Sequence, residues 1–235
     1  MKPMKHFARI FFSLPLLITA IVSAQIESGV YISEVDNLRH ELKIGEDYLI
    51  HSAYQVTPPK FIKTVGGHYT MTDSIAQVKL EFNSNHAENG LTQLSLPIIA
   101  KDGKLTLPMD GDLVFTKQES SEQALDGTWL FASRGPDEGQ ERRGDENPRK
   151  TLKFLKDGRF QWIAYNTDTM EFFGTGGGNF TSQNGKYIEN IEYFSRDDSR
   201  VGAELDFNYE IKNDDWHHTG KNSKGEPLYE IWARR

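Results

Sequence analysis

The chain has 235 residues, of which 27 are basic and 34 are acidic, and it contains no cysteine. The formal net charge of −7 at pH 7 and the scattered basic residues argue against nucleic acid as the main partner. The lack of cysteine excludes disulfides, so the core alone must stabilise the fold.

Residues 1–24 have the pattern of a signal peptide. Three basic residues precede a mostly apolar run at 10–22, and Val22-Ser23-Ala24 has the small residues of a cleavage site. The apolar run is shorter than a comfortable membrane span. We therefore expect cleavage before Gln25 and a periplasmic or secreted protein without a membrane span. A retained membrane anchor is the alternative.

From Gln25 onward, apolar and polar residues alternate, and turn signals recur about every 8–12 residues, which is typical of all-β proteins. We expect a first unit at 25–118 and a second at 124–235, joined by a short polar linker. In the first unit, strands are expected near 28–33, 38–44, 47–55, 60–70, 74–83, 92–99, 103–107 and 111–117. In the second unit, strands are expected near 127–133, 150–156, 159–166, 170–181, 186–194, 201–211, 214–220 and 227–234.

Short antiparallel strands joined by hairpins can avoid open edges when the sheet closes into a barrel. The sequence therefore predicts an all-β fold of two tandem antiparallel eight-stranded β-barrels. The interior of an eight-stranded barrel is filled by side chains or holds one small ligand.

The two units share a segment that aligns without a gap. Residues 61–70 match 172–181, and in the same register Tyr54 falls on Tyr165. Both segments carry glycines inside a strand pattern, which usually mark a bulge or a sharp corner. The glycine run at 174–178 is followed by a strand, whereas a phosphate loop needs a helix behind it. We interpret the match as an internal duplication of one β unit.

The ends of the second unit resemble those of the lipocalin (calycin) family. Gly127-Thr128-Trp129 opens the unit, and Trp232-Ala233-Arg234-Arg235 closes it. The resemblance implies that Arg234 packs across the indole of Trp129 and ties the two ends of the barrel together, an arrangement that cation–π attraction stabilises. The first unit has a weaker version of this pattern in Gly29-Val30-Tyr31 and Lys117.

Residues 124–235 are also similar to a family of secreted lipocalin-like domains of unknown function from Bacteroidetes. The similarity rests on the Gly-x-Trp motif, the glycine run, Tyr187-Ile-Glu-Asn-Ile-Glu-Tyr193 and Trp216-His-His-Thr-Gly220. It implies a calycin barrel, a cell-envelope address and a small-molecule cavity, and it brings no established reaction. The charged loop at 134–148 stands where lipocalins carry the loop that covers the barrel mouth.

All four tryptophans lie in the second unit. They can form an ordinary barrel core, or they can surround a cavity for a flat or apolar ligand or a stacked sugar ring. We predict six ligand-binding residues in the second unit: Trp162, Tyr165, Tyr187, Glu189, Trp216 and His218.

Two of these residues can ionise inside an aromatic barrel. A buried Glu189 needs a partner or stays protonated; the candidate partners are Arg149, Lys150, Arg159, Arg200 and His218. His218 is either a hydrogen-bonded core residue or a ligand contact that offers a donor and an acceptor near pH 7.

The leading hypothesis is a secreted or periplasmic lipocalin-like protein that binds a small hydrophobic or amphipathic ligand in the second barrel. One alternative is a barrel enzyme that acts on a carbohydrate or small lipid, with Glu189 and His218 as the acid/base pair. Another is a structural module of the envelope with filled barrels. We expect no cofactor and no metal site, since the adjacent His217 and His218 point to opposite faces of a strand.

Overall fold

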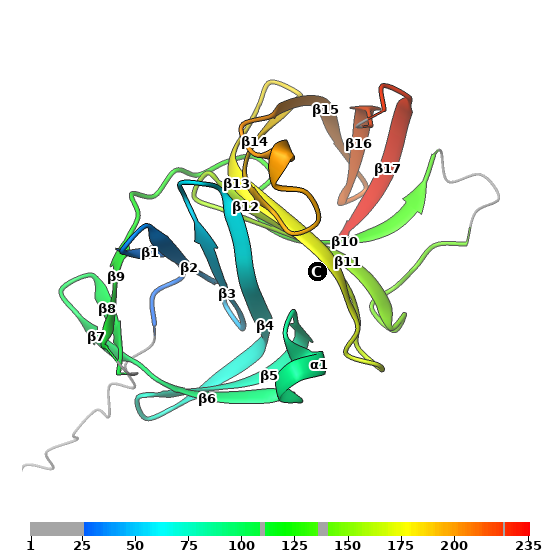
Figure 1. The fold of residues 1–235 in the computed structure, drawn as a ribbon. Helices are drawn as coiled ribbons and strands as arrows, with labels where there is room; N and C mark the ends of the chain where they lie inside the picture. The colour runs from blue at the N-terminus through cyan, green and yellow to red at the C-terminus, as the bar shows by residue number, and fades with distance from the viewer. Residues whose placement is uncertain (1–25, 109–110, 136–140, 223) are drawn as a thin grey trace, which may run out of the picture.

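The computed structural model describes residues 26–235, apart from 109–110, 136–140 and 223. The predicted signal peptide, 1–24, lies outside the described residues. Almost all regular structure in the described part is β, in two antiparallel sheets that pack side by side (Figure 1). None of the described helices is long and apolar enough to cross a membrane.

The first unit is a nine-stranded sheet that curls into a nearly closed barrel, in the order β6-β5-β4-β3-β2-β1-β9-β8-β7. Its strands are β1 (Gly29–Val35), β2 (Leu38–Ile44), β3 (Tyr48–Gln55), β4 (Lys60–Thr72), β5 (Ile75–Asn83), β6 (Gln93–Pro97), β7 (Ile99–Lys101), β8 (Lys104–Leu107) and β9 (Leu113–Lys117). One short helix, α1 (His86–Asn89), follows β5.

The first unit is a barrel as predicted, but it has nine strands in place of the expected eight, because the expected strand at 92–99 is divided. β6 pairs with β5 and β7 pairs with β8, and no described ladder joins β6 to β7. Pro97 has no N–H to donate to a ladder, and the next residue, Ile98, is buried and donates its backbone N–H to Ser74. The sheet stays open at this point.

The second unit is a closed antiparallel barrel, as predicted, whose strands follow one another in chain order. They are β10 (Gly127–Arg134), β11 (Arg149–Lys156), β12 (Arg159–Asn166), β13 (Phe172–Gln183), β14 (Lys186–Phe194), β15 (Glu204–Lys212), β16 (Asp215–Lys221) and β17 (Pro227–Arg234). Where β10 meets β17, Trp129 pairs with Arg234, whose Cζ lies 4.1 Å from the centroid of the indole. Lys117 pairs with Tyr31 at the corresponding place in the first unit.

The ladders of the two units repeat one another in register, with an offset of 111 residues. The β3–β4 ladder shifts between Ala53 and Tyr54, and the β12–β13 ladder shifts between Ala164 and Tyr165. The next ladders shift at 66–67 and at 177–178, inside the glycine pairs. Bulges at equivalent positions are stronger support for a duplication than a similar spacing of strands, because each bulge is a local feature that the sequence must specify.

The barrels contact one another through equivalent surfaces. Phe61 and Phe172, which are equivalent in the repeat, stack with ring centroids 6.3 Å apart. The Tyr54 hydroxyl donates to Glu192 Oε2 at 3.1 Å. The equivalent Tyr165 hydroxyl donates to Glu81 Oε2 at 2.7 Å, and Glu81 and Glu192 are themselves 111 residues apart. Reciprocal contacts of this kind define a pseudo-two-fold axis, as at the interface of a symmetric dimer.

An ion cluster lies buried in this interface. Arg159 Nε donates to Glu41 Oε1 at 2.7 Å, and Lys43 Nζ lies 2.8 Å from Glu41 Oε2. Burial alone would raise the pKa of Glu41, but the charges of Arg159 and Lys43 lower it to about 2. The carboxylate is therefore ionised at neutral pH and fastens the two barrels together.

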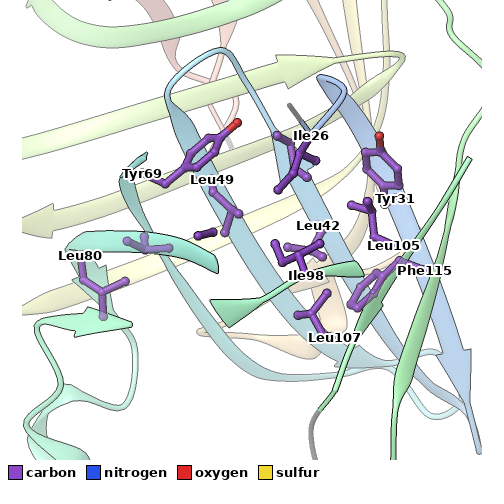
Figure 2. Packing of buried hydrophobic residues seen from close by; sticks show 13 residues of the cluster. Ile26, Tyr31, Leu42, Leu49, Tyr69, Leu80, Ile98, Leu105, Leu107 and Phe115 are labelled. Carbon is purple, nitrogen blue, oxygen red and sulfur yellow. The ribbon is translucent and has the colours of Figure 1, made fainter. Parts of the chain in front are cut away.

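The interiors of the two barrels differ in composition. The first is filled mainly by aliphatic side chains, among which Leu42, Leu105 and Ile98 converge (Figure 2). The second is filled mainly by aromatic side chains, which include Trp129, Phe160, Phe180, Tyr187, Phe207, Trp216 and Trp232.

Candidate functional site

A pocket of about 500 Å³ opens at one end of the second barrel. Its aromatic floor consists of Phe131, Trp162 and Trp232. The floor is rigid because the rings pack edge-on: Phe131 against Trp232 at 5.7 Å and Trp162 against Phe194 at 5.5 Å between centroids. Alternation along β12 turns Trp162 and Ala164 toward the barrel axis. Both residues line the pocket.

The rim of the pocket is charged. Four arginines line it, and they come from four separate segments: Arg134, Arg143, Arg149 and Arg196. Two carboxylates, Glu141 and Glu230, line it as well. The backbone N–H of Arg143 donates to Ala132 at 2.9 Å, which ties this part of the loop after β10 to the strand.

A buried ion pair lies behind Trp232 in the barrel interior. Lys153 Nζ is 2.8 Å from Glu189 Oε1, and the Tyr187 hydroxyl donates to the same oxygen at 2.7 Å. The ammonium group also lies 4.8 Å from the Trp216 ring centroid and 5.1 Å from that of Trp232. Burial and the neighbouring Glu189 raise the pKa of Tyr187 well above its usual value. Tyr187 thus stays a hydrogen-bond donor.

His218 connects this interior to the pocket. Its Nδ1 lies 3.4 Å from Glu230 Oε2, which also accepts a 3.2 Å hydrogen bond from Trp232 Nε1. Burial lowers the pKa of His218, and the positive charge of Lys153 adds to that effect. His218 is therefore neutral at pH 7. Within the described residues, neither ring nitrogen of His218 makes a hydrogen bond, and neither does Trp216 Nε1.

The six predicted ligand-binding residues occupy three different places. Trp162 lines the pocket. Tyr165 faces the first barrel, where its hydroxyl binds Glu81. The other four lie together in the buried interior and do not line this pocket: Tyr187, Glu189, Trp216 and His218.

The partner of Glu189 is a residue that the sequence analysis did not consider. Lys153 stands on the inward face of β11, whereas the apolar residues on either side of it are buried on the outward face, so alternation along the strand did not indicate that the lysine faces the interior. The rim arginines were not predicted as ligand-binding residues. Arg149 was considered only as a partner of Glu189, and Arg134 and Arg143 belong to the charged loop that the sequence analysis placed at the mouth. Residues 136–140 of that loop lie outside the described residues.

Glu189 and His218, the acid/base pair of the enzyme alternative, have different neighbours. Lys153 and Tyr187 contact Glu189, whereas His218 Nδ1 lies 3.4 Å from Glu230. No cluster of three or more histidine, aspartate or glutamate side chains with the geometry to hold a metal ion occurs in the part of the chain that the structure describes. No protein-family model matches the chain, and no curated protein matches it.

Proposed function

We propose that the chain is a lipocalin-like binding protein that holds one small amphipathic ligand in the mouth of its second barrel, in the periplasm or outside the cell. The observation that carries the proposal is the pocket of about 500 Å³ over an aromatic floor in a closed eight-stranded barrel. This volume is within the range of about 300–1,000 Å³ that small-molecule sites occupy.

The contact between Arg234 and Trp129 supports the likeness to lipocalins. The pair joins the first and last strands of the barrel at the end of the chain, as the Gly-x-Trp motif and the terminal arginine predict. Neither residue lines the pocket, so the pair supports the closure of the barrel itself. A pocket in a preformed barrel binds with a smaller entropic cost than one that must be assembled.

Fluorescence titration with N-phenyl-1-naphthylamine, a neutral aromatic probe, tests the proposal. We expect saturable binding with one site, and we expect Trp162→Ala to weaken it by about tenfold or more because the probe loses its stacking surface. His51→Ala is the matched control, since His51 occupies the equivalent position of the first barrel. Absence of probe binding, or unchanged affinity in a Trp162→Ala variant with intact circular dichroism, would contradict the proposal.

A further inference from the structure

We infer that the ligand of this pocket is an anion: a flat apolar body with a carboxylate, sulfonate or phosphate group that the rim arginines bind. The inference rests on the proposed function and adds the chemical class of the ligand. The first observation is the local charge. Four arginines and two glutamates line the pocket, in a protein whose formal net charge is −7.

The second observation is that three of these arginines have no carboxylate partner in the part of the chain that the structure describes. Within the described ranges, no aspartate or glutamate oxygen lies within 4.0 Å of the guanidinium nitrogens of Arg143, Arg149 or Arg196. By contrast, Arg142, next to Arg143 in the chain, forms two 2.6 Å hydrogen bonds with Asp215. Arg235 likewise binds both oxygens of Glu81.

The three arginines are nevertheless positioned, because aromatic rings and a carbonyl hold them. Arg149 Cζ lies 4.2 Å from the centroid of the Phe173 ring, and Arg196 Nε donates to the Phe173 carbonyl at 2.7 Å. Arg143 Cζ lies 5.5 Å from the Phe131 ring. Contacts of these kinds fix a guanidinium while leaving N–H groups for an acceptor. One residue, Phe173, therefore anchors two of the cations at the rim.

An anion would complete this arrangement. Guanidinium groups gathered at one rim repel one another, and a carboxylate, sulfonate or phosphate between them accepts charge-assisted hydrogen bonds. The carboxylate of Glu230 does not serve this purpose at the rim, because it already accepts from Trp232 and contacts His218. The indoles of Trp162 and Trp232 take the apolar body below.

The first barrel shows what the same positions look like without this function. Leu38 replaces Arg149, Asn85 replaces Arg196 and His51 replaces Trp162 in the repeat register. Neither of the two arginines anchored by Phe173 has a cationic counterpart there. These two cations of the rim are therefore specific to the second copy of the repeat.

Two probes with one aromatic body test the inference. 8-Anilinonaphthalene-1-sulfonate carries a sulfonate that N-phenyl-1-naphthylamine lacks. At low salt we expect the sulfonate to bind the intact protein about tenfold more tightly or better, and we expect this preference to shrink as NaCl rises. In Arg149→Gln/Arg196→Gln, the preference should disappear while the neutral probe keeps its affinity within about twofold.

Arg200→Gln is the control, because it changes the net charge by one unit at an arginine that does not line the pocket. It should leave the preference unchanged. Equal affinities for the two probes in the unmodified protein would overturn the inference and leave the proposed function standing. Failure of both probes to bind would overturn the proposed function and the inference with it. A preference that survives in the double variant would also refute the role of the rim.

Discussion

At equivalent inward positions, the first barrel carries Leu42 and Val78, whereas the second carries Lys153 and Glu189. The ladders are the same, so the backbone does not explain the difference. In the first barrel these side chains belong to a continuous aliphatic core. In the second they form an ion pair surrounded by aromatic rings. The first barrel thus has an aliphatic core, and the second has an aromatic core that contains an ion pair and lies below a pocket.

The mouths of the two barrels also differ: side chains pack together in the first, and the equivalent side chains line a pocket in the second. His40 and His51 stack at 5.3 Å in the first barrel, with the edge of Phe115 against them. Burial, together with the neighbouring His40, lowers the pKa of His51 to about 3, so it stays neutral and packs as a core residue. The equivalent residues of the second barrel, Thr151 and Trp162, line the pocket. Function here depends on the side chains at the site and not on the fold that both copies share.

The largest effect is expected when the interior ion pair of the second barrel is broken. Lys153→Leu, which introduces the residue of the first barrel, should destabilise the second barrel by about 3–5 kcal/mol, because Glu189 is left charged and buried without its partner. All four tryptophans lie in this barrel, so urea unfolding followed by tryptophan fluorescence reports on it selectively.

The double variant Lys153→Leu/Glu189→Val tests the comparison more directly. It gives the second barrel both residues of the first, and it removes the unpaired charge while leaving the Tyr187 hydroxyl without an acceptor, which costs about 1–3 kcal/mol. We expect the double variant to be more stable than Lys153→Leu. If it is less stable, the two interiors are not interchangeable and the equivalence of the positions fails.

Intermediate effects are expected at the pseudo-two-fold interface. Tyr54→Phe and Tyr165→Phe each remove one hydroxyl that donates to a carboxylate of the other barrel. Hydrogen bonds to charged groups contribute about 1.5–3 kcal/mol. The two variants should therefore lower the free energy of unfolding by similar amounts in that range, measured by urea denaturation. If one variant clearly lowers the free energy of unfolding and the other does not, only one half of the interface stabilises the association of the two barrels.

Much of this comparison could be predicted from the sequence. The alternation and the turn signals predict the strands, and the glycines at 66–67 and 177–178 mark the bulges that the ladders show. Pro97 indicated that the expected strand at 92–99 would be divided, because proline has no N–H group to donate to a β ladder. The closed second barrel agrees with the expectation, since no proline interrupts the corresponding β15.

The site was harder to predict, for two physical reasons. Trp162 and Tyr165 have opposite parity on one strand, so only one of them can face the barrel axis, and the aromatic content of the strand did not indicate which. The cations of the rim come from β10, from the loop after it, from β11 and from the turn after β14. These arginines come together only when the barrel closes, so their spacing along the sequence does not predict that they are neighbours.

The smallest effects are expected where each barrel joins its ends. Arg234→Ala should cost about 1 kcal/mol, because the guanidinium loses its contact with Trp129 and its 3.2 Å hydrogen bond to the carbonyl of Asp126. Lys117→Ala should cost less than about 0.5 kcal/mol, because Lys117 pairs with Glu27, whose side chain is 74% exposed. Thermal unfolding of the two variants, with Arg234→Lys beside them, measures the difference.

Arg234→Lys separates the contribution of the positive charge from the contribution of the planar guanidinium group that covers the indole. A lysine keeps the charge but not the planar group that covers the indole, so it should recover only part of the loss. Equal losses for Arg234→Ala and Lys117→Ala would mean that both barrels close through charge alone. A larger loss for Arg234→Ala means that the contact with the buried indole makes the difference, and the first and last strands of the second barrel are then joined more strongly than those of the first.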